Sequence, residues 1–573
     1  MTNEIKRYKE QMHEIHPRIP DAYTSLQDGK VSRREFLRFA TLLGMSATLA
    51  SACTALDFSD GSITGVSSGN DLILPTAKKA AKIVRGGSLK IGAEFQPIRN
   101  PAQLEWVQSS NVVRQVAEYL TLTDENNLTT PYLLERWGTN NDVTEWTLSL
   151  RKGILFNNGE ELIADDLIFN FKQWLDPNIG SSMLGLLSYL NGVSSVEKVD
   201  NYTVKLSLST PNIGVPEHLF HFPAAIMHRS FEGDFIQQPI GTGPFTLAEF
   251  VEGDRAVLKR RDDYWQLGDD GAPLPYLDEV IFNSVNKDTS VALIQSGEID
   301  TFTDPRPEDF LLLKDNPEII VQSAPTASTL VLRVRVDQGP PWNDVRVRSA
   351  LRKIQNRKKI LSLAYFDEGD LGTDAHVAPV HPAYAARAVP EYDPAGAKRL
   401  LEEWAADTGG TLPIRATIVT KNDGGEKEYA EVLQEDAAGT GFEFDLDITD
   451  PSGFWERWDK VPVGITWWSH KPLGTMVLPL TYTADANGVP VPWNETRWVD
   501  LEFSAVLKEA EGTLDITERR EKIGRLMDIF QERGPIGIAF FKNVWRIHSR
   551  RVHNLTGHPT NYELLERTWV DQT

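Results

Sequence analysis

The chain of 573 residues contains a single cysteine, Cys53. One thiol can form neither an internal disulfide nor a metal site built from several thiolates, so the packing of apolar side chains has to hold the fold together. A chain of this length exceeds what one hydrophobic core supports, and we expect two or more domains. The apolar share of 41% and the charged share of 24% are typical of a globular protein with a soluble surface.

The formal net charge of −22 at pH 7 limits the possible partners. Binding to nucleic acid requires clustered Lys and Arg side chains, so we expect no nucleic-acid partner. An anionic membrane surface is disfavoured as a docking site for the same reason. No apolar stretch reaches the roughly 18 to 20 residues of a spanning helix, and we expect the mature chain not to cross a bilayer.

Residues 32–52 have the pattern of an export signal. Basic side chains, among them Arg33 and Arg34, precede an apolar run over residues 39–52 that ends in small residues. Such a run is too short to span a membrane and is typical of a signal peptide. The motif Ser-Arg-Arg-Glu-Phe-Leu-Arg over residues 32–38 resembles the twin-arginine export signal, which implies export of the folded chain by the twin-arginine machinery.

The cysteine lies at the end of this signal. Ala50-Ser51-Ala52-Cys53 resembles a bacterial lipobox, which implies acylation of Cys53 and a membrane contact through a lipid anchor only. Ala50 stands where Leu is usual, so cleavage by an ordinary signal peptidase and release of the chain is the alternative. We therefore assign residues 1–53 to a twin-arginine-type signal peptide. Residues 54–85 are rich in Ser, Gly, Thr and Ala, which predicts a flexible tether.

Strand and helix patterns alternate along the rest of the chain, which indicates mixed α/β domains. Asp165 and Asp166 are placed to begin a helix, because carboxylates are favoured in a first turn. Asp344 is placed as an N-cap, and Pro394 as a first helical residue. Strands are predicted at residues 86–92, 146–151, 202–208, 417–419 and 442–448, and helices from residues 164 and 394 and over 344–354 and 429–437.

Several segments, taken in order, carry a resemblance to a known family. They are residues 130–137, 150–159 with 164–166, 239–245, 261–265, 292–300 and 340–348. Each is weak alone, but their order and spacing together resemble the peptide/nickel-type family (family 5) of periplasmic solute-binding proteins. The resemblance covers roughly residues 86 to 570. The physical roles of these segments are mostly structural, since aromatic residues such as Trp137 and Phe156 are more often core than ligand contacts.

The resemblance implies a fold and a function. The fold is the type II periplasmic-binding-protein fold of the α/β class, whose two hinge-linked lobes close around a ligand, with a subdomain inserted in the first lobe. The implied function is capture of a peptide-like, opine-like or sugar-like ligand and its delivery to the permease subunits of an ABC importer, by a monomer without cofactor in the periplasm or at the cell surface. The predicted parts are 86–125, 236–325 and 535–573 for the first lobe, 126–235 for the inserted subdomain, and 326–534 for the second lobe.

The second lobe contains a departure from the family pattern. Peptide-binding relatives carry a Trp-x-x-Asp element whose Asp pairs with the amine of the ligand. Here the stretch begins at Trp467 and has His470 at the position of the Asp, followed by Lys471. Because His is neutral or cationic and Lys is cationic, we expect an anionic, opine-like, sugar-phosphate-like or neutral polar ligand rather than a plain peptide held through its amine.

The predicted binding residues come from both lobes. In the second lobe, strand alternation directs one of the two adjacent indoles into the core and leaves the other for the ligand. In the first lobe, the residues after the first strand line the pocket in the family. The candidates are Trp467, Trp468, His470, Glu94, Phe95 and Gln96.

An enzyme is not expected, and we assign no catalytic residue. The nucleophile-elbow pattern Gly-x-Ser-x-Gly occurs only at residues 65–69, in the predicted tether, and no nucleotide-binding Walker motif is present. His218 and His221 have a spacing that suits a metal, but no recognisable acidic third ligand accompanies them, so no metal site is expected. A secreted hydrolase or a chaperone on the same scaffold is the alternative function.

Overall fold

The computed structural model describes residues 12–13, 15–16, 18–45, 83–94, 96–485 and 487–572. Cys53, Phe95, the predicted tether up to residue 82 and the Gly-x-Ser-x-Gly pattern lie outside the described residues. Among the residues that are described, no helix combines the length and the apolarity that crossing a bilayer requires.

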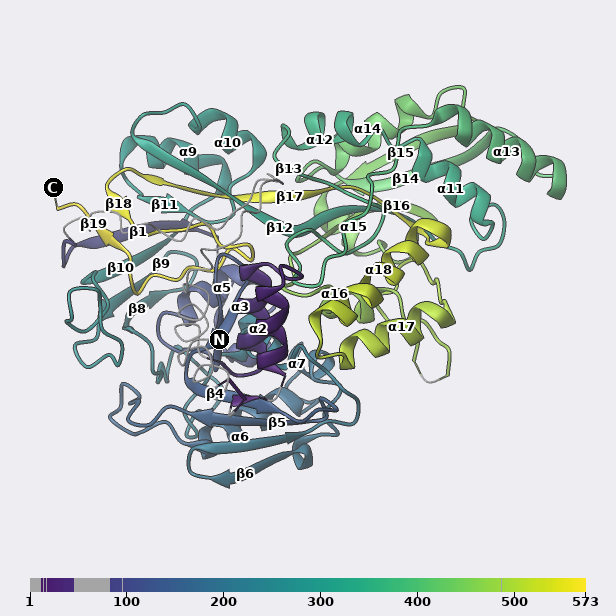
Figure 1. Ribbon diagram of the computed structural model, residues 1–573. Coiled ribbons are helices and arrows are strands. Elements are labelled where there is room, and N and C mark those ends of the chain that lie inside the picture. The colour runs from purple at the N-terminus through teal and green to yellow at the C-terminus, as the bar shows by residue number, and fades with distance from the viewer. Residues whose placement is uncertain are drawn as a thin grey trace.

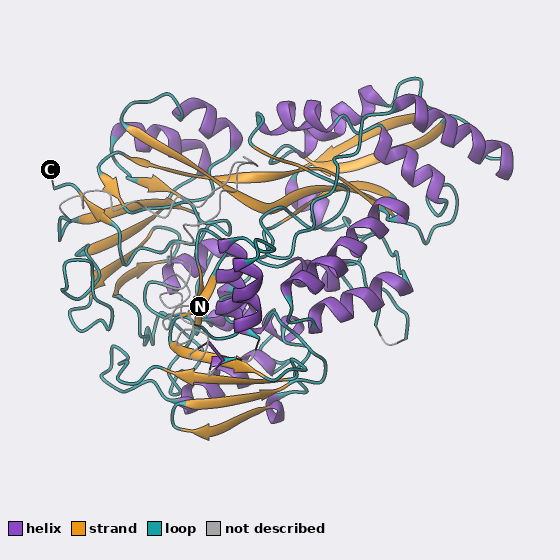
Figure 2. Cartoon of the chain, viewed as in Figure 1, coloured by secondary structure: helices purple, strands orange, loops and turns teal. Residues whose placement is uncertain are grey.

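One large sheet forms the backbone of the molecule (Figures 1 and 2). Its strands follow the order β15-β14-β16-β12-β17-β11-β1-β10-β9-β8, with β13 beside β17. The strands are β1 (Ser88–Ala93), β8 (Phe245–Val251), β9 (Arg255–Arg260), β10 (Glu279–Ser284), β11 (Thr301–Phe302), β12 (Ile319–Val334), β13 (Gly369–Leu371), β14 (Ile414–Lys421), β15 (Phe442–Thr449), β16 (Val463–Trp468) and β17 (Ile536–Ser549).

Strands β12 and β17 connect two lobes. They run antiparallel, and the part of β12 before Pro325 lies beside β17 at the end of the sheet that contains β1 and β8 to β11. After a register shift between Pro325 and Thr329, β12 continues beside β16 at the other end. A break in the ladder removes regular hydrogen bonds, so this point is suited to bending. It falls at the predicted boundary between the lobes.

Helices cover the two ends of the sheet (Figure 2). In the first lobe they are α5 (Val107–Val113), α9 (Lys287–Ser296) and α10 (Pro307–Leu313). In the second lobe they are α11 (Val345–Lys353), α12 (Arg357–Tyr365), α13 (Pro394–Thr408), α14 (Glu426–Asp436), α15 (Pro451–Trp455), α16 (Gly474–Thr481), α17 (Leu501–Gly512) and α18 (Ile516–Arg533). The C-terminal residues add a short β18 (Val552–His553) and β19 (Trp569–Val570) pair to the first lobe.

A separate four-stranded sheet lies below the first lobe in Figure 1. Its order is β4-β5-β7-β6, formed by β4 (Leu134–Thr139), β5 (Glu145–Leu150), β6 (Val196–Asp200) and β7 (Thr203–Ser207), and α6 (Ala164–Leu175) packs against it. Trp146 and Trp174 fill its core. The carboxylate of Asp166 accepts the backbone N–H of Ile163 at 3.0 Å, as predicted for a residue in a first helical turn. Short elements around it are β2 (Thr121–Thr123), β3 (Thr129–Pro131), α7 (Met183–Leu186) and α8 (Val215–His218).

Two helices near the N-terminus pack onto the body of the protein, where Figure 1 shows them in purple. They are α2 (Ile19–Gln27) and α3 (Arg33–Leu42). Ser32 and Glu35 form a capping box at the start of α3, which explains why the helix begins directly at the Arg pair. The buried face of α3 includes Phe36 and Phe39. The described part of the predicted signal segment is thus folded, and its role in export stays a prediction.

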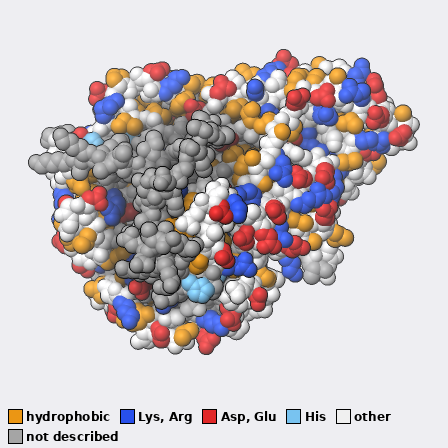
Figure 3. All heavy atoms as spheres, viewed as in Figure 1, with side chains coloured by type: hydrophobic (Ala, Val, Ile, Leu, Met, Phe, Trp, Pro, Cys, Tyr) orange, Lys and Arg blue, Asp and Glu red, His pale blue; other side chains and the backbone are white. Residues whose placement is uncertain are grey.

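The surface carries both signs of charge despite the acidic total. On the face seen in Figure 3, acidic and basic side chains are interspersed over the area that is not drawn in grey. On the second lobe, Arg533 pairs with Asp500 at 2.6 Å and with Glu502 at 2.6 Å. Such partly exposed pairs contribute little to stability individually.

Candidate ligand-binding site

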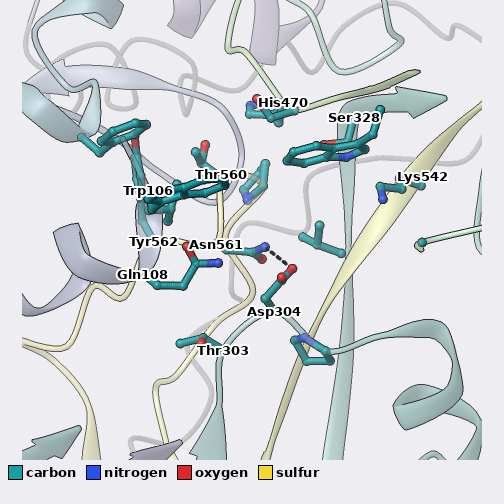
Figure 4. Close-up of a pocket in the computed structure, with 18 of the residues that line it drawn as sticks. Trp106, Gln108, Thr303, Asp304, Ser328, His470, Lys542, Thr560, Asn561 and Tyr562 are labelled. Atoms are coloured by element: carbon teal, nitrogen blue, oxygen red, sulfur yellow. Dashed lines mark hydrogen bonds between the residues drawn. The ribbon is translucent and has the colours of Figure 1, made fainter. Parts of the chain in front are cut away.

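A cavity of about 560 Å³ lies where the two lobes and the connecting strands meet. Its lining comes from the loop after β1, the start of α5, the loop around Asp304, the middle of β12 and β17, the end of β16 and the C-terminal loop. In Figure 4, Trp106, Gln108 and Tyr562 lie on one side of the cavity, and Ser328 and Lys542 on the other. A ligand in this space would contact both lobes at once.

The two adjacent indoles of β16 have different environments. Trp467 is half-buried and lines the cavity. Trp468 is buried on the opposite side of the strand, where its Nε1 donates to the carboxylate of Glu495 at 3.0 Å. That carboxylate also pairs with Arg333 at 2.8 Å, so it is held firmly. The structure therefore brings Trp467 to the cavity and places Trp468 in the core.

His470 lines the cavity, but both of its ring nitrogens are already engaged. Nδ1 accepts the backbone N–H of Ala327 at 3.0 Å, and Nε2 faces the side-chain oxygen of Asn127 at 3.3 Å, so the ring is neutral with its proton on Nε2. Burial holds the pKa of His470 well below the usual value for histidine. Asn127 belongs to the β2–β3 turn, and its amide also donates to the carbonyl of Pro472 at 2.8 Å. His470 thus takes part in a link between the second lobe and this turn.

The first-lobe candidates lie at the cavity edge. Glu94 and Gln96 are exposed and line the cavity, while Phe95 lies outside the described residues. Among the described residues on this side, Trp106 is an exposed aromatic residue, with 53% of its surface accessible. Together these residues offer an acceptor, an amide and a stacking surface to a ligand.

Some of the charged groups in the cavity wall form two ion-pair clusters. Lys287 pairs with Asp304 at 2.6 Å, and Asp304 has a left-handed backbone with φ of 54°. Lys421 pairs with Asp423 at 2.9 Å and with Glu426 at 2.8 Å. Because these cations already have carboxylate partners, they are less available to a ligand than an unpaired cation would be.

The two histidines whose spacing suits a metal, His218 and His221, do not lie on one helical face. Helix α8 ends at His218, and His221 follows it outside the helix. His218 is buried, with Nδ1 in a hydrogen bond of 2.9 Å to the hydroxyl of Tyr189, and burial lowers its pKa to about 3. Within the part of the chain that the structure describes, no three His, Cys, Asp or Glu side chains are grouped to hold a metal ion.

Sequence reasoning missed several cavity residues. Trp106, Asp304 and Tyr562 come from loops whose packing no periodicity predicts. Lys542 carried a signal that could have been used, because it is a lone charge inside the apolar run of residues 536–545. A charged residue in a buried strand is costly unless it has a function or a partner.

These features define a class of protein: a two-lobed α/β receptor with a cavity at the hinge, formed from both lobes. The chain belongs to the bacterial extracellular solute-binding proteins, family 5, whose sequence model matches residues 129–488. It is therefore an extracytoplasmic solute-binding protein on a two-lobe periplasmic-binding fold, as the sequence predicted, and the family is one of binding proteins rather than hydrolases.

Several known proteins are similar to this chain in sequence or in fold. Di/tripeptide-binding protein 1 of Pseudomonas aeruginosa is 26% identical over 466 residues, which cover 75% of this chain and 83% of that protein. The periplasmic binding protein DppA of Helicobacter pylori, solved with the peptide STSA, matches 85% of this chain and 99% of its own with a TM-score of 0.69 and 21% identity. AgaA of A. tumefaciens R10, solved with agropinic acid, matches 85% and 99% with a TM-score of 0.68 and 20% identity.

Proposed function

We propose that this protein captures a small amino-acid-derived ligand, peptide-like or opine-like, in the cavity between its lobes and delivers it to the permease subunits of an ABC importer. A sugar-like ligand is the remaining alternative within the same function. The proposal is carried by one observation, the cavity of about 560 Å³ whose wall includes residues of both lobes and of the connecting strands. A volume of this order is typical of small-molecule sites. The names of the relatives, which mention dipeptides, tripeptides and agropinic acid, support the ligand class.

The mechanism is a shift between open and closed states. A ligand that contacts Trp106 on one lobe and Trp467 on the other makes its full set of contacts only when the lobes are closed. Ligand binding therefore favours the closed state by the difference in its affinity for the two states. The register shift between Pro325 and Thr329 supplies the bending point. The closed form, as a monomer, is the one that would dock on the permease.

The ligand screen is the first test. The full chain is heated with di- to pentapeptides, opines, oligosaccharides and nickel chelates, and its melting temperature is recorded. A ligand at about 100 times its dissociation constant adds about 2.7 kcal/mol to the free energy of unfolding, which is readily seen as a rise in melting temperature. Each stabilising compound is recovered and analysed by mass spectrometry. Recovery of the unchanged compound is expected, whereas a cleaved compound, or no stabilisation by any class, would contradict the proposal.

We also propose that residues 1–53 direct export by the twin-arginine route and that Cys53 is acylated. The motif around Arg33 and Arg34 and the lipobox-like residues before Cys53 support this. Replacing both arginines by lysine should keep the precursor in the cytoplasm, while Arg18→Lys, outside the motif, should leave export unchanged. Cys53→Ser should abolish labelling by a radioactive fatty acid. Normal export of the double-lysine variant would contradict the twin-arginine route. Labelling of the Cys53→Ser variant would contradict acylation of Cys53.

A further inference from the structure

The cations of the cavity wall differ in whether they have a partner. Lys287 and Lys421 belong to the two ion-pair clusters described above, and Arg306 pairs with Asp288 at 2.7 Å. Lys542 is different. Across the described residues, its Nζ makes no hydrogen bond and no ion pair, and its neighbours are the faces of two aromatic rings. Nζ lies 5.4 Å from the ring centre of Tyr365 and 5.6 Å from that of Trp467.

The backbone holds Lys542 at the bending point of the molecule. It lies in the middle of β17, directly after the buried Phe540 and Phe541. Its carbonyl accepts the hydroxyl of Thr326 at 2.6 Å, and Thr326 belongs to the stretch of β12 in which the register shifts. The backbone of Lys542 is thus held at the junction of the lobes, and Figure 4 shows the side chain beside the cavity.

The energetics of this position favour an anionic partner. An ammonium group has three N–H donors, and withdrawal from water without hydrogen bonds is unfavourable. Burial lowers the pKa of Lys542 for this reason. Ring faces compensate only in part, because a cation–π contact is weak beside a charge-assisted hydrogen bond and accepts no conventional hydrogen bond. The charges of Glu426, Asp304 and Asp423 also act on Lys542, but each of these carboxylates is already paired with another lysine.

We infer that Lys542 is the specificity-determining residue for the ligand and binds its carboxylate, flanked by Tyr365 and Trp467. The inference rests on the proposed function, since it concerns the same cavity. A carboxylate anchor at Lys542 explains why His470 can replace the Asp of the family pattern. Both ring nitrogens of His470 are engaged within the protein, so this position does not hold a ligand amine. The ligand is then anchored by its acidic end instead of its amine, and the anchor sits on a strand that both lobes share.

One other cavity cation needs comparison. Lys471 also has no partner for its Nζ among the described residues, and burial lowers its pKa to about 8. It lies beside His470, and its charge acts on His218 and His221 of the inserted subdomain. It has no flanking ring faces of the kind that surround Lys542 in this part of the structure. The inference therefore predicts that replacing Lys542 weakens ligand binding more than replacing Lys471.

The test compares ligands with and without a carboxylate. Calorimetry on the full chain uses alanyl peptides of two to five residues as free acids and as C-terminal amides. The acids should bind wild type, and the amides should bind about tenfold more weakly or worse, the effect of losing one charge-assisted hydrogen bond. Lys542→Met should weaken acid binding by about tenfold or more, Lys542→Arg by less, and Lys471→Met by less than Lys542→Met. Lys314→Met is the matched control, because Lys314 also lies over a ring, 5.7 Å from that of Phe310, outside the cavity.

Failure of the inference can be told from failure of the proposed function. If acids and amides bind equally, or Lys542→Met binds acids as wild type does, the inference is wrong while the proposed function stands. If no peptide binds, the ligand is not peptide-like. The carboxylate site is then tested with citrate, a small polycarboxylate without a peptide backbone. Citrate should raise the melting temperature of wild type and of Lys314→Met more than that of Lys542→Met. Equal protection of all three would overturn the carboxylate site. Melting of each variant without ligand verifies that it is folded.

Discussion

At the scale of the residue, Glu118 allows a test of how burial controls charge in this fold. It is 2% exposed, and burial raises the pKa of its carboxyl to about 7 although the hydroxyl of Tyr264 donates to it at 2.6 Å. A pKa raised on folding means that the folded state binds the proton more tightly, so wild type loses stability as pH rises from about 4.5 through about 7.

The Glu118→Gln variant lacks this dependence. The free energy of unfolding of the variant minus that of wild type should increase by up to roughly 3 kcal/mol from pH 5 to pH 8, because wild type loses stability over this range. Each unit of pKa shift corresponds to about 1.4 kcal/mol. Denaturation by urea at the two pH values measures the difference. A difference between the two proteins that is the same at pH 5 and at pH 8 would show that Glu118 ionises normally in the folded protein.

At the scale of the element, local signals were sufficient for the helices and strands that the sequence analysis named, which are a minority of those in the structure. The Asp344 carboxylate accepts the backbone N–H of Arg346 at 2.8 Å, as predicted for an N-cap, and α13 begins at Pro394. Strands β14 and β15 flank α14 as the sequence indicated, and they pair in parallel. In the candidate site, alternation along β16 predicted that the two indoles would separate, but not which one would line the cavity.

At the scale of the whole molecule, contacts between distant segments were not predictable from the sequence. The junction of the lobes depends on the pairing of β12 with β17, for example Ile319 with Ser549, and no local pattern specifies such a register. The predicted division into lobes came from the resemblance to a family, and its exact boundaries stay a prediction. Lys542 became a candidate only when this pairing placed it beside Tyr365 and Trp467.

The same scale contains an unexpected link between the N-terminal helices and both lobes. Arg38 of α3 donates to the carbonyl of Asn126 at 2.7 Å, and the indole of Trp137 donates to the carbonyl of Leu42 at 2.7 Å, both on the side of the inserted subdomain. Glu35 pairs with Arg520 of α18 in the second lobe. Helix α3 therefore contacts two parts of the molecule that, in the proposed function, separate when the cavity opens.

Loosening these helices should release the lobes. Phe36→Ala removes a fully buried ring that packs edge-on against Tyr23 at 5.7 Å, and a change of this kind costs about 3–5 kcal/mol. We expect faster hydrogen exchange over residues 18–45 and a larger radius of gyration by small-angle scattering without ligand, because the tie to Arg520 is weakened. Lys30→Ala, at an exposed turn between the two helices, is the control and should change neither quantity. If exchange accelerates in Phe36→Ala while the radius of gyration stays that of wild type, the helices pack on the body without restraining the lobes.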